Sequence, residues 1–193
     1  MSLATWRSPL ARALHRNRSE PHSRYFQLAT LRPDGLPANR TIVFRGFLND
    51  TNQLIVITDG RSDKIAHVTY QPWAEACWYF TKTREQFRLF GRLQLIDDSH
   101  RDTLYIATRQ QIWQKLSDKA RSQFYWPTPG ALRADNQPFE TSAVDGIQPP
   151  SCFCLLLIDP TQVDHLELKG NPQNRYRHHI QKDNLWCKVN INP

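Results

Sequence analysis

Glycine is scarce in this sequence, with 7 residues among 193. No glycine-rich loop links a predicted strand to a predicted helix, so the chain lacks the backbone cradle with which P-loop and dinucleotide-binding folds hold phosphates. Helices are also missing after most of the predicted strands, although a doubly wound parallel sheet needs one at nearly every crossover. These absences argue against the common nucleotide-binding α/β folds.

Self-sufficient catalytic patterns are also missing. The sequence shows no Ser-His-Asp set, no paired-carboxylate site and no activated cysteine. Of the four cysteines, Cys152 and Cys154 lie on one face of a predicted strand, outside metal-ligand spacing, and His178-His179 would complete a site only if the fold brought them near. We expect no metal, and we interpret the cysteines as reduced, buried small hydrophobic residues. Redox chemistry would therefore need a bound cofactor.

No apolar run is long enough to span a bilayer. The N-terminal stretch MSLATWRSPLARALHRNR lacks the uninterrupted apolar core of a secretory signal. Its apolar residues recur near helical spacing, which predicts a short amphipathic helix, while its arginines leave a mitochondrial-type leader as an alternative. We expect a cytoplasmic protein.

The formal net charge is +7, which raises the question of a nucleic-acid partner. The basic residues are scattered, however, and form neither a basic helix face nor a zinc-finger or helix-turn-helix pattern. A few cations gathered around one phosphorylated small molecule would explain the charge equally well, so nucleic acid is not the partner we expect.

Short runs rich in β-branched and aromatic residues make up most of the chain, with turn signals between them. This pattern predicts one mainly β (α+β) domain over residues 1–193, a mostly antiparallel barrel with a few peripheral helices. A helical and loop insert is expected at about 98–150. The predicted strands are 25–31, 36–47, 54–58, 73–80, 85–96, 153–158, 163–168, 175–180 and 185–189.

Two further helices are predicted, one after Ser62 and ending before Pro72, and one from Asp97 to about Lys115. Ser62 is the expected N-cap of the first, and Asp98 or Ser99 of the second. The apolar side of the second helix is expected to consist of Leu104, Thr108, Ile112 and Leu116. Gly91 is expected to mark a bulge or tight bend in its strand.

Arg40 and Arg45 bracket the apolar run 42–44 in a strand that looks covered on both faces. Burying an unpaired guanidinium is costly, so this placement conflicts with local rules. Either both side chains reach a wet barrel rim or pair with acids, or they meet an anionic ligand.

Two further groups of cations raise the same question. Arg61 and Lys64 lie where a helix begins, and there the macrodipole favours an anion. Asp63 compensates in one interpretation, and a phosphate bound by backbone N–H groups, Ser62 and Lys64 does so in the other. Arg175 and Arg177 share one side of a strand, either as a solvated edge or as a grip on an anion.

In this order, the motifs resemble those of the pyridoxamine 5′-phosphate oxidase family, FMN-binding split β-barrels, and most of all its oxidase-related, functionally uncharacterised branch. The likeness runs from about Ser23 to Ala107 and from Pro150 to the end. Four motifs carry it: Arg40-Thr41-Ile42-Val43-Phe44-Arg45; Ile57-Thr58 followed by Ser62-Asp63-Lys64; Glu85-Gln86-Phe87; and Arg175 with Arg177 before Trp186.

The resemblance implies FMN as the cofactor and a homodimer with flavin at the subunit interface. The flavin-binding residues it implies are Arg40, Thr41, Ile42, Val43, Thr58, Arg61, Ser62, Lys64, Gln86, Ser122 and Arg177, the last reaching the site from the partner chain. The substrate-side residues it implies are Arg45, Tyr105, Arg109 and Arg175. No protein residue is assigned a catalytic role, because the flavin carries the reaction.

Departures from the family pattern concern the substrate. Trp113 stands where a small hydroxyl residue is expected, and Arg45 where the oxidases carry a lysine. Asp63 replaces a second cation, for which Arg61 would substitute, and Leu166 lies near where an aromatic residue would cover the flavin. The loop 126–150 has no clear counterpart.

The expected function is that of an FMN-dependent oxidoreductase related to pyridoxamine-phosphate oxidase. In that reaction hydride passes from the substrate to FMN, and oxygen reoxidises the flavin. The expected substrate is a small molecule, and a phosphorylated one would suit the cations. Two alternatives remain open: a flavin-dependent reductase or oxidase acting on another small molecule, and a basic protein that binds no flavin.

Overall fold

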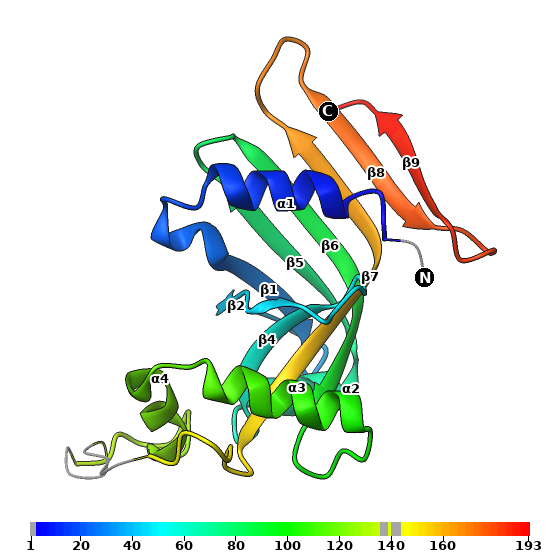
Figure 1. Ribbon diagram of the computed structural model, residues 1–193. Coiled ribbons are helices and arrows are strands. Elements are labelled where there is room, and N and C mark those ends of the chain that lie inside the picture. Colours follow the sequence, from blue (N-terminus) through cyan, green and yellow to red (C-terminus); the bar gives the residue numbers. More distant parts are fainter. Residues whose placement is uncertain (1–2, 136–138, 140–143) are drawn as a thin grey trace.

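The computed structural model describes residues 3–135, 139 and 144–193. Within them, nine strands form one antiparallel sheet (Figure 1). The strands are β1 Tyr25–Leu31, β2 Pro37–Val43, β3 Gly46–Phe47, β4 Leu54–Asp59, β5 Trp73–Phe80, β6 Glu85–Ile96, β7 Phe153–Glu167, β8 Asn174–Ile180 and β9 Trp186–Ile191. The helices are α1 Arg7–Arg16, η1 Pro21–Arg24, α2 Lys64–Tyr70, α3 Thr103–Gln114, α4 Asp118–Ser122 and η2 Gln123–Tyr125.

The long strand β7 divides the sheet. The strand order is β2-β1-β5-β6-β7-β4-β3, and β8 also pairs with β7 and carries β9. The first part of β7, Phe153–Ile158, pairs with β4, whereas its last part, Gln162–Glu167, pairs with β8. On its other side, β6 follows β7 along nearly its whole length. Because β4 and β8 diverge from β7, the barrel is split, as expected from the resemblance (Figure 1).

Gly91 allows β6 and β7 to cross closely, and the irregularity predicted there is confirmed. The register shifts between Phe90 and Gly91, opposite Pro160. A Cβ atom at Gly91 would lie 2.6 Å from Cα of Pro160 and 2.7 Å from the carbonyl carbon of Asp159. Only glycine fits such a backbone approach, so this residue is required where the sheet bends.

Two predictions of strand extent are wrong. The predicted strands 153–158 and 163–168 form one continuous strand, because the bulge at Gly91 absorbs Pro160 without ending the ladder. The predicted strand 36–47 is two strands, because Gly46 has a φ of 136° and the ladder partner changes from β1 to β4.

Strand β2, which carries most of the Arg40–Arg45 motif, is not covered on both faces in the single chain. Side chains of β2 alternate, with Thr41 exposed and Ile42 buried, since β2 lies at an edge of the sheet. The interpretation of a doubly buried strand is therefore wrong for the chain by itself. The apolar run 42–44 reflects burial of Ile42 and Phe44, with Val43 only half-buried.

The predicted helices exist, but their caps differ. Asp63 occupies the N-cap position of α2 without a side-chain cap, and the Ser62 hydroxyl instead donates to the Asp59 carbonyl, 2.7 Å away. Helix α3 begins later than predicted, because Asp102 accepts from the Leu104 N–H and caps it, in place of Asp98 or Ser99.

The buried face of α3 agrees with the predicted one except at its first turn. Thr108 and Leu116 are buried and Ile112 packs against the core, whereas Leu104 is 43% exposed. The prediction missed Arg109 and Trp113, which are also buried. Trp113 forms a small core with Phe124 and Phe153, which attaches the insert to the end of the barrel.

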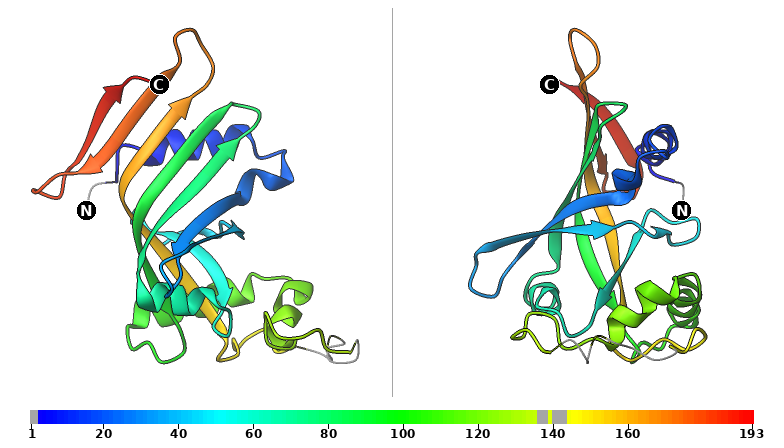
Figure 2. Two further views of the ribbon diagram at one scale, coloured as in Figure 1. Left: turned by 180° about the vertical axis from the view of Figure 1, so that it is seen from behind. Right: turned by 90° about the vertical axis from the view of Figure 1, so that its left-hand side faces the viewer.

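The larger core lies between α1 and the sheet. Trp6 and Leu10 are fully buried against Trp78 and Phe80 of β5 and Phe87 of β6, which confirms the predicted N-terminal helix. Helix α1 covers one face of the upper sheet and leaves the opposite face open, as Figure 2 shows from behind. In the part of the chain that the structure describes, no helix has the length and apolar character needed to cross a bilayer.

We predict that Gly91→Ala lowers the free energy of unfolding by about 1–3 kcal/mol, because the added methyl group overlaps the β7 backbone and not a flexible side chain. Urea denaturation followed by tryptophan fluorescence measures the change. Gly146→Ala is the matched control, since its Cβ atom would meet only the Arg121 side chain at 3.4 Å. Equal stability of the two variants would contradict the proposed close crossing.

Candidate functional site

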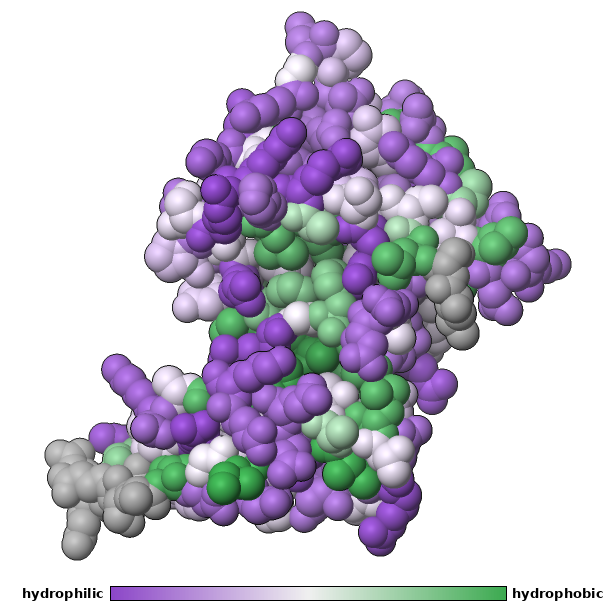
Figure 3. All heavy atoms as spheres, viewed as in Figure 1, coloured by the Kyte–Doolittle hydropathy of each residue, from purple (hydrophilic) through white to green (hydrophobic). Residues whose placement is uncertain are grey.

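A cleft of about 440 Å³ lies between the barrel and the insert. Figure 3 shows the molecule hollowed between its strand-rich upper part and the insert at lower left. Strands β2 and β4 and the start of α2 form one wall, and residues of α4, η2 and the segment after them form the other. The cleft is lined by Arg40, Thr41, Ile42, Val43, Arg45, Ile57, Thr58, Asp59, Lys64, Ala120, Gln123, Phe124, Trp126 and Pro129.

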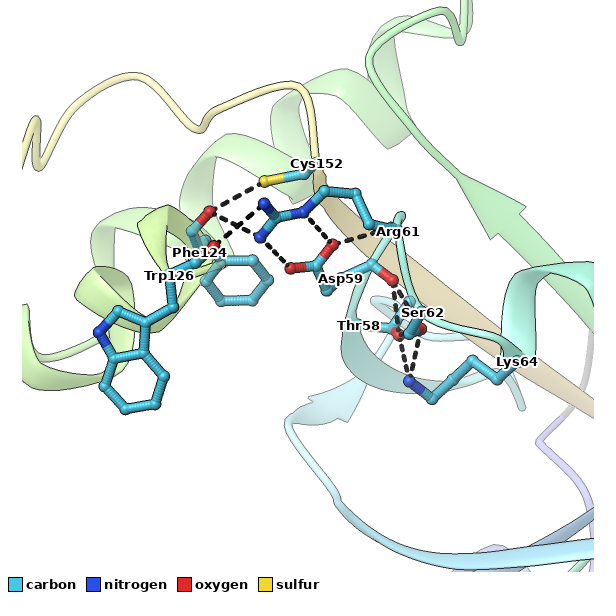
Figure 4. Close-up of polar contacts among 8 residues, drawn as sticks. All are labelled: Thr58, Asp59, Arg61, Ser62, Lys64, Phe124, Trp126 and Cys152. Carbon is cyan, nitrogen blue, oxygen red and sulfur yellow. Dashed lines mark hydrogen bonds and ion pairs between the residues drawn. The ribbon is translucent and has the colours of Figure 1, made fainter. Parts of the chain in front are cut away.

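Lys64 presents a half-buried ammonium group with only hydroxyl partners. Its Nζ donates to Thr58 Oγ1 at 2.9 Å and to Ser62 Oγ at 2.8 Å (Figure 4). No ion pair with a described carboxylate neutralises it. Burial and then the nearby Arg40 guanidinium lower the pKa of Lys64. The turn before α2 thus holds a cation and two hydroxyl groups together, as the sequence predicts for Thr58, Ser62 and Lys64.

Arg40, in the same wall of the cleft, is fixed by neutral acceptors. Its Nη1 donates to the carbonyl oxygen of Leu28 at 3.0 Å and to Thr30 Oγ1 at 2.6 Å. Its Nη2 faces His67 Nδ1 at 3.2 Å. Burial, followed by repulsion from Arg32, lowers the pKa of Arg40. Its positive charge is therefore positioned without being neutralised by any described acid.

Arg45 adds a third cation to the cleft lining. Its Nε atom is buried and has no hydrogen-bond partner among the described residues. Burial and the Arg24 guanidinium lower its pKa. A buried donor without a partner costs free energy. Arg45 would therefore be stabilised if it moved to donate to an acceptor on a ligand.

Arg61 lies outside the cleft lining and joins its two walls. It forms an ion pair with Asp59, with Nη2 2.7 Å from Oδ2, and that hydrogen bond raises the pKa of Arg61. Its Nη1 and Nη2 also donate to the carbonyl oxygens of Trp126 and Phe124, respectively (Figure 4). The described hydrogen bonds of the Arg61 side chain go to Asp59 and to these two carbonyl groups, and its contact with flavin stays a prediction.

The predicted residues of the insert do not line the cleft. The Ser122 hydroxyl donates to the Lys119 carbonyl of its own helix. Tyr105 packs edge-on against His100. Arg109 is buried and donates to the backbone carbonyl oxygens of Phe153 at 2.7 Å and Pro150 at 2.6 Å. In this arrangement Arg109 anchors the insert, because irregular backbone leaves carbonyl groups that need donors.

Gln86, Arg175 and Arg177 share the open face of the upper sheet, away from the cleft. Gln86 pairs with Leu166 across β6 and β7, and Leu166 pairs with Arg175. Arg175 is tied to the buried Asp164 by hydrogen bonds of 2.9–3.2 Å. Arg177 is exposed, with no hydrogen bond or ion pair to another described residue. One chain by itself therefore does not bring these three residues to the cleft.

Glu85, His165 and Glu167 form the one group of three metal-capable side chains found among the described residues. His165 Nε2 lies 3.0 Å from Glu85 Oε2. The adjoining hollow is lined by three cations as well as the two glutamates: Arg12, Arg16 and Lys169. These positive charges compete with a divalent ion for the carboxylates, so the cluster supports no metal assignment.

Several residues of the site were not predicted from the sequence. They include the cleft residues Ile57, Asp59, Ala120, Gln123 and Pro129, and three that matter for the argument, namely His67, Phe124 and Trp126. His67 lies one helical turn after Lys64, a spacing that places both on one side of α2, and this signal was available. Phe124 and Trp126 come from a segment without periodicity, so only the fold reveals that they face the cleft.

The residues present fit a phosphate-bearing ligand. Arg40, Arg45 and Lys64 converge on one cleft, and the nearest lining acid, Asp59, is occupied by Arg61. Hydroxyl and guanidinium donors are the groups that bind phosphate oxygens. Apolar lining from Ile42 and Phe124 suits an aromatic ring beside the charged end.

Comparison with known proteins agrees with this geometry. Residues 3–97 match the family model described as pyridoxamine 5′-phosphate oxidase, FMN-binding domain. A pyridoxine/pyridoxamine 5′-phosphate oxidase 2 of Arabidopsis thaliana is 36% identical over 194 residues, covering 99% of this chain and 98% of that protein.

Solved structures show the same relationship. A pyridoxamine 5′-phosphate oxidase-related, FMN-binding protein of Nostoc punctiforme is 56% identical, with a TM-score of 0.96 and full coverage of both chains. PhzG of Burkholderia lata, at 18% identity and a TM-score of 0.77 over 96% of this chain and 91% of that one, shares the fold. These matches support the predicted cofactor, FMN, and the chain belongs to the pyridoxamine 5′-phosphate oxidase family of FMN-binding split barrels.

Proposed function

We propose that this chain is an FMN-dependent oxidoreductase that holds the cofactor phosphate with Arg40, Ser62 and Lys64. One observation carries the proposal: a half-buried ammonium group and a guanidinium group face one cleft, and neither has a described carboxylate partner. Such an arrangement costs free energy unless an anion binds there. FMN supplies both that phosphate and a ring able to accept hydride from an organic substrate.

The remaining cleft residues would hold the flavin ring. The β2 segment Thr41–Val43 lines the cleft as an edge strand, so backbone groups on its outer side can bond a ligand. Thr58 offers a hydroxyl beside Lys64. Phe124 and Trp126 of the insert close the opposite wall and would exclude water from the reacting atoms.

The functional unit we propose is a homodimer with the flavin at the interface. The sheet face that α1 leaves open carries the exposed aromatic residues Tyr25, Trp73, Tyr79 and Phe90, of which Trp73 and Phe90 stack at 5.3 Å. Aromatic residues gathered on an exposed face are typical of an interface. Gln86, Arg175 and Arg177 lie on that face and would reach the cleft of the partner subunit.

The proposed reaction is oxidation of a small amine or alcohol, with pyridoxamine 5′-phosphate as the first substrate to test. Its aminomethyl group would lose a hydride from carbon and a proton from nitrogen, which amounts to two electrons and two protons, and would become an imine. O₂ would accept the two electrons and two protons to give hydrogen peroxide, and water would then hydrolyse the imine and release ammonia. Arg45, which lines the cleft, is the leading residue for the substrate phosphate, with Arg175 of the partner subunit beside it.

A second candidate is a flavin-dependent enzyme acting on another small molecule. The Arg109 side chain donates to two backbone carbonyl groups. Trp113, one helical turn later, has a fully buried indole. In this arrangement α3 offers no free cation for a substrate phosphate. That observation favours a substrate whose anionic group differs in position or kind from that of pyridoxamine phosphate.

We predict that Lys64→Met raises the dissociation constant of FMN at least about tenfold, because a charge-assisted contact is lost. FMN fluorescence titration of the apoprotein measures the change. Lys115→Met is the matched control, since Lys115 is exposed at the end of α3. Unchanged affinity in Lys64→Met would remove Lys64 from the phosphate site.

Mixed dimers test the shared site. We predict that a dimer of one Lys64→Met chain and one Arg177→Ala chain binds one FMN, because one of its two sites keeps both native residues and the other loses both. Absorbance of the purified mixed dimer gives the stoichiometry, at FMN concentrations where each parent variant stays largely empty. Zero FMN per mixed dimer, or a native affinity for the Arg177→Ala parent, would show that Arg177 does not complete the partner's site.

Substrate choice is tested by peroxide release from a panel of amines and alcohols that includes pyridoxamine 5′-phosphate and pyridoxamine. If Arg45 binds the substrate phosphate, Arg45→Met raises KM for the phosphorylated amine by about tenfold or more and leaves FMN affinity unchanged. Activity on another panel member, with none on pyridoxamine phosphate, would favour the second candidate.

A further inference from the structure

His67 of α2 is a buried histidine in direct contact with Arg40. Its exposed fraction is 7%, and its Nδ1 lies 3.2 Å from Arg40 Nη2 and 3.0 Å from Thr30 Oγ1. Thr30 in turn accepts from Arg40 Nη1 at 2.6 Å. Three side chains from β1, β2 and α2 thus form a closed triangle around one imidazole nitrogen.

The donors in this triangle determine the protonation state of His67. A guanidinium group only donates, so Arg40 requires an acceptor at Nδ1. The Thr30 hydroxyl accepts from Arg40 with one of its two lone pairs, and its proton can share the single lone pair of Nδ1 with Arg40. The geometry is therefore satisfied when the imidazole is neutral and carries its proton on Nε2. A second proton, on Nδ1, would face the Arg40 guanidinium directly.

The triangle lies where the cleft meets a second hollow. That hollow, of about 820 Å³, is lined by His67, Arg32 and Asp63, and it shares Arg40 and Lys64 with the cleft. Arg40 lines both spaces, and the second hollow offers its guanidinium group room to leave the position that the triangle fixes.

Charges of both signs surround His67. The Arg40 and Arg32 guanidinium groups of the β1–β2 hairpin disfavour its protonation, while Asp63 before α2 and Asp34 in the hairpin turn favour it. Burial and these arginines outweigh the aspartates, so the pKa of His67 is lowered from its ordinary value. The lowered pKa favours the neutral imidazole, and protonation of His67 requires a lower pH than for an ordinary histidine.

We propose that His67 is a positioning residue that holds Arg40 in its phosphate-binding position only while the imidazole is neutral, so that acid releases FMN. This inference rests on the proposed function, since it takes Arg40 to bind the cofactor phosphate. Protonation replaces an acceptor with a donor at Nδ1 and places two cations side by side, and the guanidinium moves away. Binding of FMN is then linked to the loss of one proton from His67.

The test compares His67→Ala and His67→Asn with the native protein. The asparagine carbonyl oxygen can accept near the Nδ1 position and takes up no proton, so it separates the acceptor from the titration. FMN and riboflavin are titrated into each apoprotein at pH 7.5 and pH 5.5, with far-UV circular dichroism confirming the fold. His22→Asn is the matched control, because His22 is exposed and bonded to Thr81 on another part of the sheet.

At pH 7.5 we expect His67→Ala to weaken FMN binding about tenfold, His67→Asn to stay within about threefold of native, and riboflavin affinity to be unchanged in both. On going to pH 5.5 the native protein and His22→Asn should lose more FMN affinity than His67→Asn. The difference should stay below about tenfold, because one linked proton changes affinity by at most about tenfold per pH unit and the pKa of His67 lies below its ordinary value. The second ionisation of the ligand phosphate affects all variants equally and cancels in this comparison.

Two results would overturn the inference: native FMN affinity in His67→Ala, or the same acid loss in His67→Asn as in the native protein. An increase of native affinity in acid relative to His67→Asn would also overturn it, since the imidazolium would then attract the phosphate. Failure of the native apoprotein to bind FMN at pH 7.5 would instead refute the proposed function, so the two failures are distinguishable.

Discussion

The convergence of like charges on one cleft is the constraint on which the site depends. Arg40 lies near enough to Lys64 to lower the pKa of its ammonium group, and both side chains are partly buried. Their positions are held by hydroxyl, carbonyl and imidazole acceptors, none of which neutralises them. Asp59 and Asp63 offset only part of the repulsion and desolvation at Lys64, and binding of an anion would relieve more of both.

The split of the barrel makes this convergence geometrically possible. The first half of strand β7 pairs with β4, which leads into the turn before α2. The second half pairs with β8. The first half supports the cleft, and the second supports the open face with Arg175 and Arg177. The close crossing at Gly91 and Pro160 allows β7 to continue from the cleft end of the sheet to the open face. A single irregular position therefore connects the cofactor end with the proposed interface.

Arginine has two distinct roles in this molecule. Arg61 and Arg109 are satisfied by backbone carbonyl groups of irregular segments, with Asp59 as an added partner for Arg61. They stabilise the insert, whose carbonyl groups lack a regular ladder. Arg45 and Arg177 lack such partners among the described residues. Arg40 combines the two situations, because its donors are engaged by neutral groups of the protein and it also lines the cleft.

Periodicity, turn residues and local motifs were enough to predict most of the strands, the α1 helix, the bulge at Gly91 and the family, because neighbours in the chain encode them. The resemblance also indicated that Arg40, Thr58, Ser62 and Lys64 belong together. The fold was needed to show that Arg61 and Arg109 face carbonyl groups, that Trp113 belongs to the core of the insert, and that His67 contacts Arg40. Each of these depends on contacts between residues at least 27 positions apart, or on side-chain volume within a core, and local propensity contains neither.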